Sequence, residues 1–307
     1  MGSGAALERS LRLDSPVNVA LTLAPLQRGG SDPCQRRTPD GAVWRASRMP
    51  SGTVTFRATQ AGRNVVDVRA WGEGSEELLD GFPKMLCLDD DHSDFVPAHP
   101  KIAEAHRRFP DLRMLRTGRV FESLVPAVLE QKVHGIAAWA SWRQLVRRFG
   151  ERAPGPAPHG MFVSPSAETW RYVPSWEFHR ANVDPRRAKT IVTAARIADR
   201  LEEAVGMNRV DAEARLRSVP GIGIWTAAEI AQRALGDSDA VSVGDFHLAA
   251  LVGWTLLGRP LDDDGMVEYL EPLRPHRYRA IRLLEVAGFA TKPKFGPRTA
   301  VTDHSWH

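Results

Sequence analysis

The residues whose types and spacing could do chemistry lie in a glycine hairpin and at an aspartate that follows it. Gly221 and Gly223 separate two helix-forming stretches, and Asp245 comes 20 positions after Trp225. Glycine permits positive φ and lets a backbone approach another molecule closely. The helix that the pattern predicts over about 224–235 would present unpaired N–H groups and its positive dipole end at the hairpin. This arrangement predicts a binding site for a phosphate group.

Asp245 stands immediately before an apolar stretch, 246–257, that predicts a further helix. An aspartate in that place can cap the helix, because its carboxylate accepts hydrogen bonds from backbone N–H groups. Its short distance in sequence from the hairpin supports a second interpretation, in which the carboxylate is held beside a bound nucleic-acid backbone. The residues alone leave both interpretations open.

Composition narrows the class of protein. A chain of 307 residues can hold two or three domains, and 43% hydrophobic with 25% charged residues is typical of a soluble globular protein. A net charge of +4 permits a polyanionic partner without requiring one. The cysteines, Cys34 and Cys87, form no CxxC pair, which predicts a reduced, cytoplasmic protein with no zinc-finger or iron–sulfur site and no cofactor. No apolar run reaches about 18 residues, and the N-terminus lacks a signal-peptide core.

The pattern along the chain predicts an α+β fold in three regions. Region 1–95 alternates apolar and polar residues at 17–23, 42–47, 53–59 and 64–71, which predicts an antiparallel sheet with one buried face. A helix over 74–86 is expected to pack on it through Leu78 and Leu79. Region 96–290 has helical periodicity, with the hairpin at about 216–235, and region 291–307 is a basic tail. The acidic tract at 89–92 lacks the spacing of a calcium loop and is expected to be a solvated linker.

Helices are expected over 119–131, 134–150, 187–204, 262–273 and 277–288, with a break at 131–133. Arginine and lysine are concentrated in this helical half. They are compatible with solvated helix faces, and equally with the positive lining of a DNA groove.

These motifs together resemble the helix-hairpin-helix DNA glycosylases of the Gly/Pro…Asp superfamily. The sequence is most similar to the bacterial 3-methyladenine DNA glycosylase II (AlkA-like) branch. The resemblance is carried by VPGIGIWTAAEIAQRAL from residue 219, VSVGDFHL from 241, LVPAVLEQKV from 124 and RPHRYRAIRLL from 274. It covers about residues 100–290 and implies a two-lobed helical core, with the β-rich N-terminus as the additional sheet domain of that branch.

The resemblance implies roles for two residues. Asp245 matches the catalytic aspartate, whose carboxylate stabilises the sugar cation formed as the glycosidic bond breaks, an effect of roughly 3–4 kcal/mol, or orients the attacking water. Trp225 stands where bifunctional members carry a Schiff-base lysine, so base excision without strand cleavage is expected. The absence of a four-cysteine cluster excludes the endonuclease III and adenine-mismatch branches.

The resemblance also implies a set of DNA contacts. Residues expected to contact DNA are Gly221, Gly223, Ile224 and Thr226 of the hairpin, and Gln131, Lys132 and Val133 of a wedge loop. Lys132 stands where an apolar intercalator is expected, so Gln131 or Val133 are alternatives for the wedge. A monovalent cation could be held by backbone carbonyls of Arg217, Val219 and Ile222. The expected partner is double-stranded damaged DNA, bound by a monomer.

The substrate pocket departs from the branch at two positions. Trp225 could stack on a cationic alkylated purine or only pack beneath the hairpin. Glu229 stands in place of a tyrosine and Glu285 in place of a tryptophan, and each is either a surface residue or part of an anionic pocket. A 3-methyladenine-type substrate is therefore expected, with a deaminated or bulky purine as the alternative. A damage-binding protein without catalysis is the further alternative.

Overall fold

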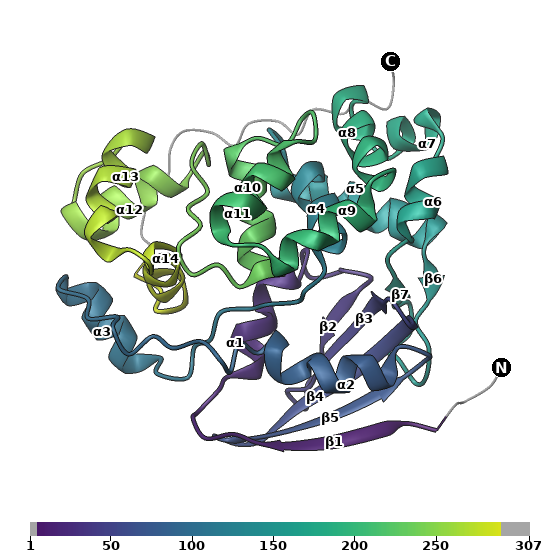
Figure 1. Ribbon diagram of the computed structural model, residues 1–307, viewed down its shortest axis with the longest axis horizontal. Coiled ribbons are helices and arrows are strands. Elements are labelled where there is room, and N and C mark those ends of the chain that lie inside the picture. Colours follow the sequence, from purple (N-terminus) through teal and green to yellow (C-terminus); the bar gives the residue numbers. More distant parts are fainter. Residues whose placement is uncertain (1–4, 290–307) are drawn as a thin grey trace.

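The N-terminal part of the chain folds into an antiparallel sheet. The computed structural model describes residues 5–289, and its main sheet has five strands in the order β1-β5-β4-β3-β2, each antiparallel to its neighbours (Figure 1). The strands are β1 (Leu7–Arg12), β2 (Gln35–Arg37), β3 (Val43–Met49), β4 (Gly52–Gly62) and β5 (Val65–Trp71). The sheet followed by helices confirms the α+β class.

One face of the sheet forms a core with two helices. Val43, Phe56 and Val68 point to this face and are buried against α1 (Val19–Leu23) and α2 (Ser75–Met85). Leu78 and Leu79 of α2 are buried in the same core, as predicted. The expected strand at 17–23 is wrong, because this stretch forms α1. The side chain of Asn18 accepts a hydrogen bond from the backbone N–H of Leu21 at 3.1 Å and so caps the helix.

The opposite face of the sheet is covered at one end, so the prediction of a single buried face is wrong. Trp44 and Trp71 stack there with ring centroids 5.5 Å apart. A second, two-stranded sheet of β6 (Glu151–Arg152) and β7 (Phe162–Val163) packs over them. The proline-rich turn that joins these two strands therefore serves as a cover for the sheet.

The helices form two lobes, each with its own buried apolar cluster (Figure 1). The first lobe contains α4 (Val120–Leu129), α5 (Gly135–Phe149), α6 (Ala167–Tyr172), α7 (Ser175–Arg180), α8 (Pro185–Ala195), α9 (Ala198–Glu202), α10 (Arg209–Arg217) and α11 (Ile224–Ile230). The second contains α3 (Pro100–Arg108), α12 (Leu248–Leu257), α13 (Asp263–Leu270) and α14 (Arg277–Val286). Within α4 every residue except Glu122 is buried, which places this apolar helix at the centre of the first lobe.

Three predicted helices differ from the observed ones: one is interrupted, one changes type along its length, and one begins later than predicted. The helix expected over 187–204 is interrupted at 196–197, between α8 and α9. The helix expected over 224–235 is α11 continued by a π-helical segment, Ala231–Leu235. The apolar helix after Asp245 begins only at Leu248, so Asp245 lies in a short turn before it.

The acidic tract after the sheet is only partly solvated as predicted: Asp89 and Asp91 are exposed, whereas Asp90 is fastened to the second lobe. Asp90 pairs with Arg279 of α14, and its side chain is largely buried. Asp89 accepts a hydrogen bond from Arg116 at 2.8 Å, and Asp94 pairs with His276 at 2.9 Å.

Two carboxylates of the first lobe join it to the sheet region. Glu122 pairs with Arg45 of β3 and accepts a hydrogen bond from the Ser47 hydroxyl at 2.6 Å. Glu130, just after α4, accepts two hydrogen bonds of 3.0 Å from Arg28. We call Glu122 and Glu130 the interface carboxylates.

Among residues 5–289, no helix has the length and apolar character needed to cross a membrane. The predicted basic tail, 291–307, lies outside the described residues.

Candidate active site

Asp245 is held by three hydrogen bonds at the junction of the two lobes. Its Oδ1 accepts from the backbone N–H groups of His247 and Leu248, at 2.8 and 3.0 Å. Its Oδ2 accepts from the indole Nε1–H of Trp225 at 3.2 Å. The carboxylate thus caps the start of α12, as the first interpretation predicts, and it also contacts the hairpin helix. A half-buried carboxylate fixed in this way has its charge in a defined place.

Gly244 determines how the chain enters this turn. Its φ is +88°, in the left-handed region that a residue with a Cβ rarely adopts. The N–H of Asp245 then donates to the carbonyl of Ser242 at 3.1 Å. The backbone on the N-terminal side of Asp245 is therefore folded back on itself.

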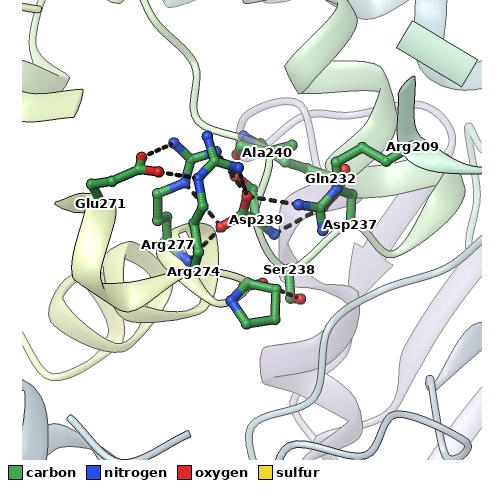
Figure 2. A network of polar contacts seen from close by, with 10 residues as sticks. Arg209, Gln232, Asp237, Ser238, Asp239, Ala240, Glu271, Arg274 and Arg277 are labelled. Atoms are coloured by element: carbon green, nitrogen blue, oxygen red, sulfur yellow. Dashed lines mark hydrogen bonds and ion pairs between the residues drawn. The ribbon is translucent and has the colours of Figure 1, made fainter. Parts of the chain in front are cut away.

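An aspartate–arginine network fastens the loop that leads to Asp245 (Figure 2). The side chain of Asp239 is 0% exposed and pairs with Arg209 of α10 at 2.6 Å, Arg274 at 2.9 Å and Arg277 of α14 at 2.7 Å. Arg209 also pairs with Asp237 at 2.8 Å. Since α10 and α14 belong to different lobes, this network joins the lobes beside the candidate catalytic loop.

The Asp239 carboxylate is held in its charged form. Burial alone would raise the pKa of Asp239, but hydrogen bonds from Arg277 and the charges of Arg277 and Arg209 outweigh it and lower this pKa. This network could not be predicted from the sequence, because its arginines lie far from Asp239 along the chain and at no regular spacing.

The two hairpin glycines differ in conformation. Gly221 has φ +96°, and a Cβ built on it would lie 2.1 Å from the Thr190 hydroxyl oxygen of α8. Gly223 has φ −93°, and its Cβ would meet no atom within 4 Å. Of the two glycines, only Gly221 adopts the positive φ that glycine permits. Gly221 is required by the packing of the hairpin on α8, whereas Gly223 is exposed and sterically free.

This difference gives a prediction that separates stability from DNA contact. Gly221→Ala should destabilise the protein by about 1–3 kcal/mol, because the substitution adds backbone strain and a collision with Thr190. Gly223→Ala should unfold in urea at the wild-type midpoint. If the hairpin binds phosphate, Gly223→Ala weakens binding to every duplex sequence alike, measured by fluorescence anisotropy. Equal destabilisation by both substitutions would contradict the prediction.

The wedge-loop candidates occupy different environments. Gln131 donates from Nε2 to the Gly221 carbonyl at 2.9 Å and to the Thr226 hydroxyl at 2.8 Å, so it ties this loop to the hairpin. Thr226 as a whole residue is 2% exposed, so neither its side chain nor its backbone is open to a DNA contact. Lys132 is exposed with φ +54°, and Val133 is half-buried.

Two exposed apolar side chains near these loops were missed by the sequence analysis. Phe246, directly after Asp245, is 91% exposed, and Ile136, in the first turn of α5, is also exposed. Ile224, a predicted DNA contact, is exposed at the start of α11. Exposed apolar residues scattered singly are normal, so only position draws attention to them: Phe246 adjoins Asp245, Ile224 begins the hairpin helix, and Ile136 follows the wedge loop along the chain.

The two pocket glutamates each have an arginine partner. Glu229 on α11 accepts from Arg233 at 2.8 Å and from the Ser242 hydroxyl at 2.6 Å. Glu285 on α14 pairs with Arg282 and is 38% exposed. Burial raises the pKa of Tyr278, and the charges of both glutamates add to this effect. The two carboxylates therefore lie within electrostatic reach of one buried tyrosine between the lobes.

The predicted cation ligands lie around the same hairpin. Arg217 ends α10, and the Val219 carbonyl accepts a hydrogen bond from the Ile222 N–H at 3.0 Å. Across residues 5–289, no group of three or more histidine, cysteine, aspartate or glutamate side chains is arranged to hold a metal ion.

No protein-family model matches the chain. A curated protein of Mycobacterium tuberculosis (strain ATCC 25618 / H37Rv), named probable bifunctional transcriptional activator/DNA repair enzyme AlkA, is 29% identical over 254 residues. The match covers 80% of this chain and 50% of that protein, so the chain spans half the length of this relative.

Solved structures share the fold. The 3-methyladenine DNA glycosylase from Archaeoglobus fulgidus superposes with a TM-score of 0.77 at 20% identity, covering 92% of this chain and 98% of the other. An 8-oxoguanine glycosylase/lyase from Clostridium acetobutylicum, in its apo form, superposes with a TM-score of 0.70 at 13% identity, covering 95% and 100%. At these identities the likeness establishes the fold and leaves the reaction to the residues of the site.

Proposed function

We propose, from the premise that this chain belongs to the AlkA-like helix-hairpin-helix DNA glycosylases, that it excises alkylated purines from double-stranded DNA. The proposed reaction is hydrolysis of the N-glycosidic bond, which leaves an abasic site. The observation that carries it is the Asp245 carboxylate, fixed at the hairpin by Trp225 and by the start of α12.

Asp245 acts in this proposal by electrostatic stabilisation. As the bond between the base and C1′ lengthens, positive charge develops on the sugar, and a carboxylate already in place stabilises that charge without reorganising. The bond electrons leave with the base, and water adds to C1′ with loss of a proton. The same carboxylate can accept that proton or orient the water.

Trp225 supports a reaction without strand cleavage. A lyase step needs an amine that forms a Schiff base with C1′. Trp225 occupies the corresponding position, and its indole N–H is engaged with Asp245. Because solved structures with this fold include a glycosylase/lyase, the absence of lyase activity rests on this residue and not on the fold.

An alkylated purine fits this site for two reasons. Such a base carries positive charge, which weakens its glycosidic bond and attracts it to the face of an aromatic ring, by about 0.5–2 kcal/mol. The base must also leave the stack, at a cost of a few kcal/mol that damage reduces. Trp225 supplies an aromatic ring next to the carboxylate, and the Archaeoglobus fulgidus structure with this fold is a 3-methyladenine DNA glycosylase by name.

A panel of lesions tests the proposal. The purified protein is incubated with DNA containing 3-methyladenine or 7-methylguanine, and with duplexes containing hypoxanthine, 8-oxoguanine or no lesion. We expect release of the methylated bases and abasic sites that break only after alkali treatment. Release of hypoxanthine alone would contradict the substrate, strand breaks without alkali would contradict the absence of lyase activity, and tight binding without any base release would contradict catalysis.

A further inference from the structure

One face of the hairpin helix is bonded to the loop that carries Asp245. Trp225 and Glu229 are spaced i, i+4 on α11, and Gln232 lies in the π-helical segment that continues it; the hydrogen bonds of all three to one loop place them on the same side. Trp225 bonds to Asp245 at 3.2 Å, and Glu229 bonds to the Ser242 hydroxyl at 2.6 Å. Gln232 donates to the Ala240 carbonyl and to the Ser242 hydroxyl, both at 2.9 Å. We call Trp225, Glu229 and Gln232 the helix ladder.

We propose that Glu229 is a positioning residue, which acts through Ser242 to fix Asp245, and not a residue that contacts the damaged base. Ser242 is the link, because its carbonyl accepts the N–H of Asp245 at 3.1 Å while its hydroxyl is held by two rungs of the helix ladder. A displacement of Ser242 therefore displaces the backbone of Asp245. This inference rests on the proposed function of Asp245.

The hydrogen bonds of Glu229 argue against a role in base recognition. Its Oε1 accepts from Ser242, and its Oε2 accepts from Arg233. The side chains of Glu229 and Arg233 are both largely buried, so their charges compensate each other in the interior. Burial alone would lower the pKa of Arg233, but the charge and hydrogen bond of Glu229, together with the charges of Tyr278 and Glu130, outweigh it and raise this pKa. The pair therefore adds no net anionic charge for a cationic base.

Arg233 connects the helix ladder to the N-terminal region. Its Nε donates to the Pro25 carbonyl at 3.0 Å, while its Nη1 donates to the Glu229 carboxylate and to the Glu229 carbonyl, at 2.8 and 2.9 Å. Pro25 lies in the segment just after α1, which packs on the sheet. The position of Asp245 thus depends on three parts of the chain that are far apart in sequence.

The first measurement separates chemistry from binding. Glu229→Ala should lower the single-turnover rate of methylated-base release by up to about 10²-fold, the loss associated with a misplacement of about 1 Å in a catalytic group. Its affinity for a duplex containing a tetrahydrofuran abasic analogue should stay at the wild-type value. Glu229→Gln, which keeps an oxygen acceptor, should lose less. Glu104→Gln, which removes the charge of another i,i+4 glutamate–arginine pair, on α3, is the control and should keep the full rate.

A mutant cycle tests the route through Ser242. Ser242→Ala removes one hydroxyl and tests the proposal even if Glu229→Ala does not fold. If Glu229 acts through this hydroxyl, removing Glu229 as well should cause no further loss, so the double variant should be no slower than Ser242→Ala alone. Multiplied rate losses would overturn the proposal.

An NMR readout is independent of glycosylase activity, so the positioning proposal can fail or hold separately from the proposed function. The indole N–H signal of Trp225 is assigned by its disappearance in Trp225→Phe. It should shift in Glu229→Ala and in Ser242→Ala without DNA, because the Asp245 carboxylate moves. An unmoved Trp225 signal in folded variants would overturn the proposal. If lesion preference also changed in those variants, Glu229 would be a residue that contacts the damaged base.

Discussion

Asp245→Asn should reduce the single-turnover rate of methylated-base release by about 10²–10³-fold, the usual effect of removing one preorganised electrostatic group. The variant loses the negative charge that would stabilise the sugar cation. The Trp225 indole N–H also loses its acceptor if the amide Nδ2 of the new asparagine faces it, because two N–H donors cannot bond to each other. The rate is measured with the protein in excess over DNA containing 3-methyladenine or 7-methylguanine.

Two controls accompany this measurement. Trp225→Phe removes the indole donor but keeps the carboxylate and an aromatic ring, so it should lose less than Asp245→Asn. The affinity of Asp245→Asn for lesion-containing duplex should be retained, because the hairpin is unchanged. Base release by Asp245→Asn at the wild-type rate would contradict the catalytic role of this residue.

Asp239→Asn should cost about 3–5 kcal/mol of stability, as expected when one partner of a buried ion pair is removed. Its carboxylate is completely buried and pairs with three arginines from both lobes (Figure 2). Arg209 and Arg274 are partly exposed and can be solvated, which favours the lower end of this range. The measurement is the free energy of unfolding from urea denaturation.

The matched control is Asp80→Asn, which removes a carboxylate paired with Arg9 at an exposed site. Exposed pairs of this kind contribute about 0–1 kcal/mol, so the control should be nearly neutral. Equal effects of the two substitutions would contradict the structural role of the Asp239 network.

The Asp239 network also predicts how stability depends on pH. Because the pKa of Asp239 is lower in the folded protein than its ordinary value of 3.8, the unfolded state binds more protons in acid. The stabilisation from Asp239 should be complete above about pH 5 and should be lost as pH falls through 3.8 and below. Asp239→Asn should show a shallower acid dependence than wild type between pH 5 and 3. Parallel pH curves would contradict this.

The sequence was sufficient for features that depend on local spacing. The hairpin, the helix stripes and the placement of Asp245 near Trp225 all follow from residues that are close along the chain. The stretch at 17–23 forms a helix because Asn18 caps it, and in a stretch this short the alternation of apolar and polar residues does not exclude a helix. Apolar periodicity also does not report the π-helical segment after α11.

Features that depend on partners far apart in sequence could not be predicted. The role of Glu229 depends on Ser242 and Arg233, and the glutamate alone is equally compatible with a pocket residue. Gly221 and Gly223 look equivalent in sequence, but only Gly221 packs against Thr190. For Glu229 and for Gly221, the contact that determines the role comes from a part of the chain outside the residue's own helix or hairpin.

The interface carboxylates, Glu122 and Glu130, bear on whether the helical part can exist as a module. Their arginine partners, Arg45 and Arg28, both belong to the N-terminal region. A chain shortened to the two helical lobes would lose both arginine partners. The two glutamates would then be solvated, and the ion pairs that join the lobes to the sheet region would no longer contribute to stability. The N-terminal region therefore contributes to the stability of the first helical lobe through these two ion pairs.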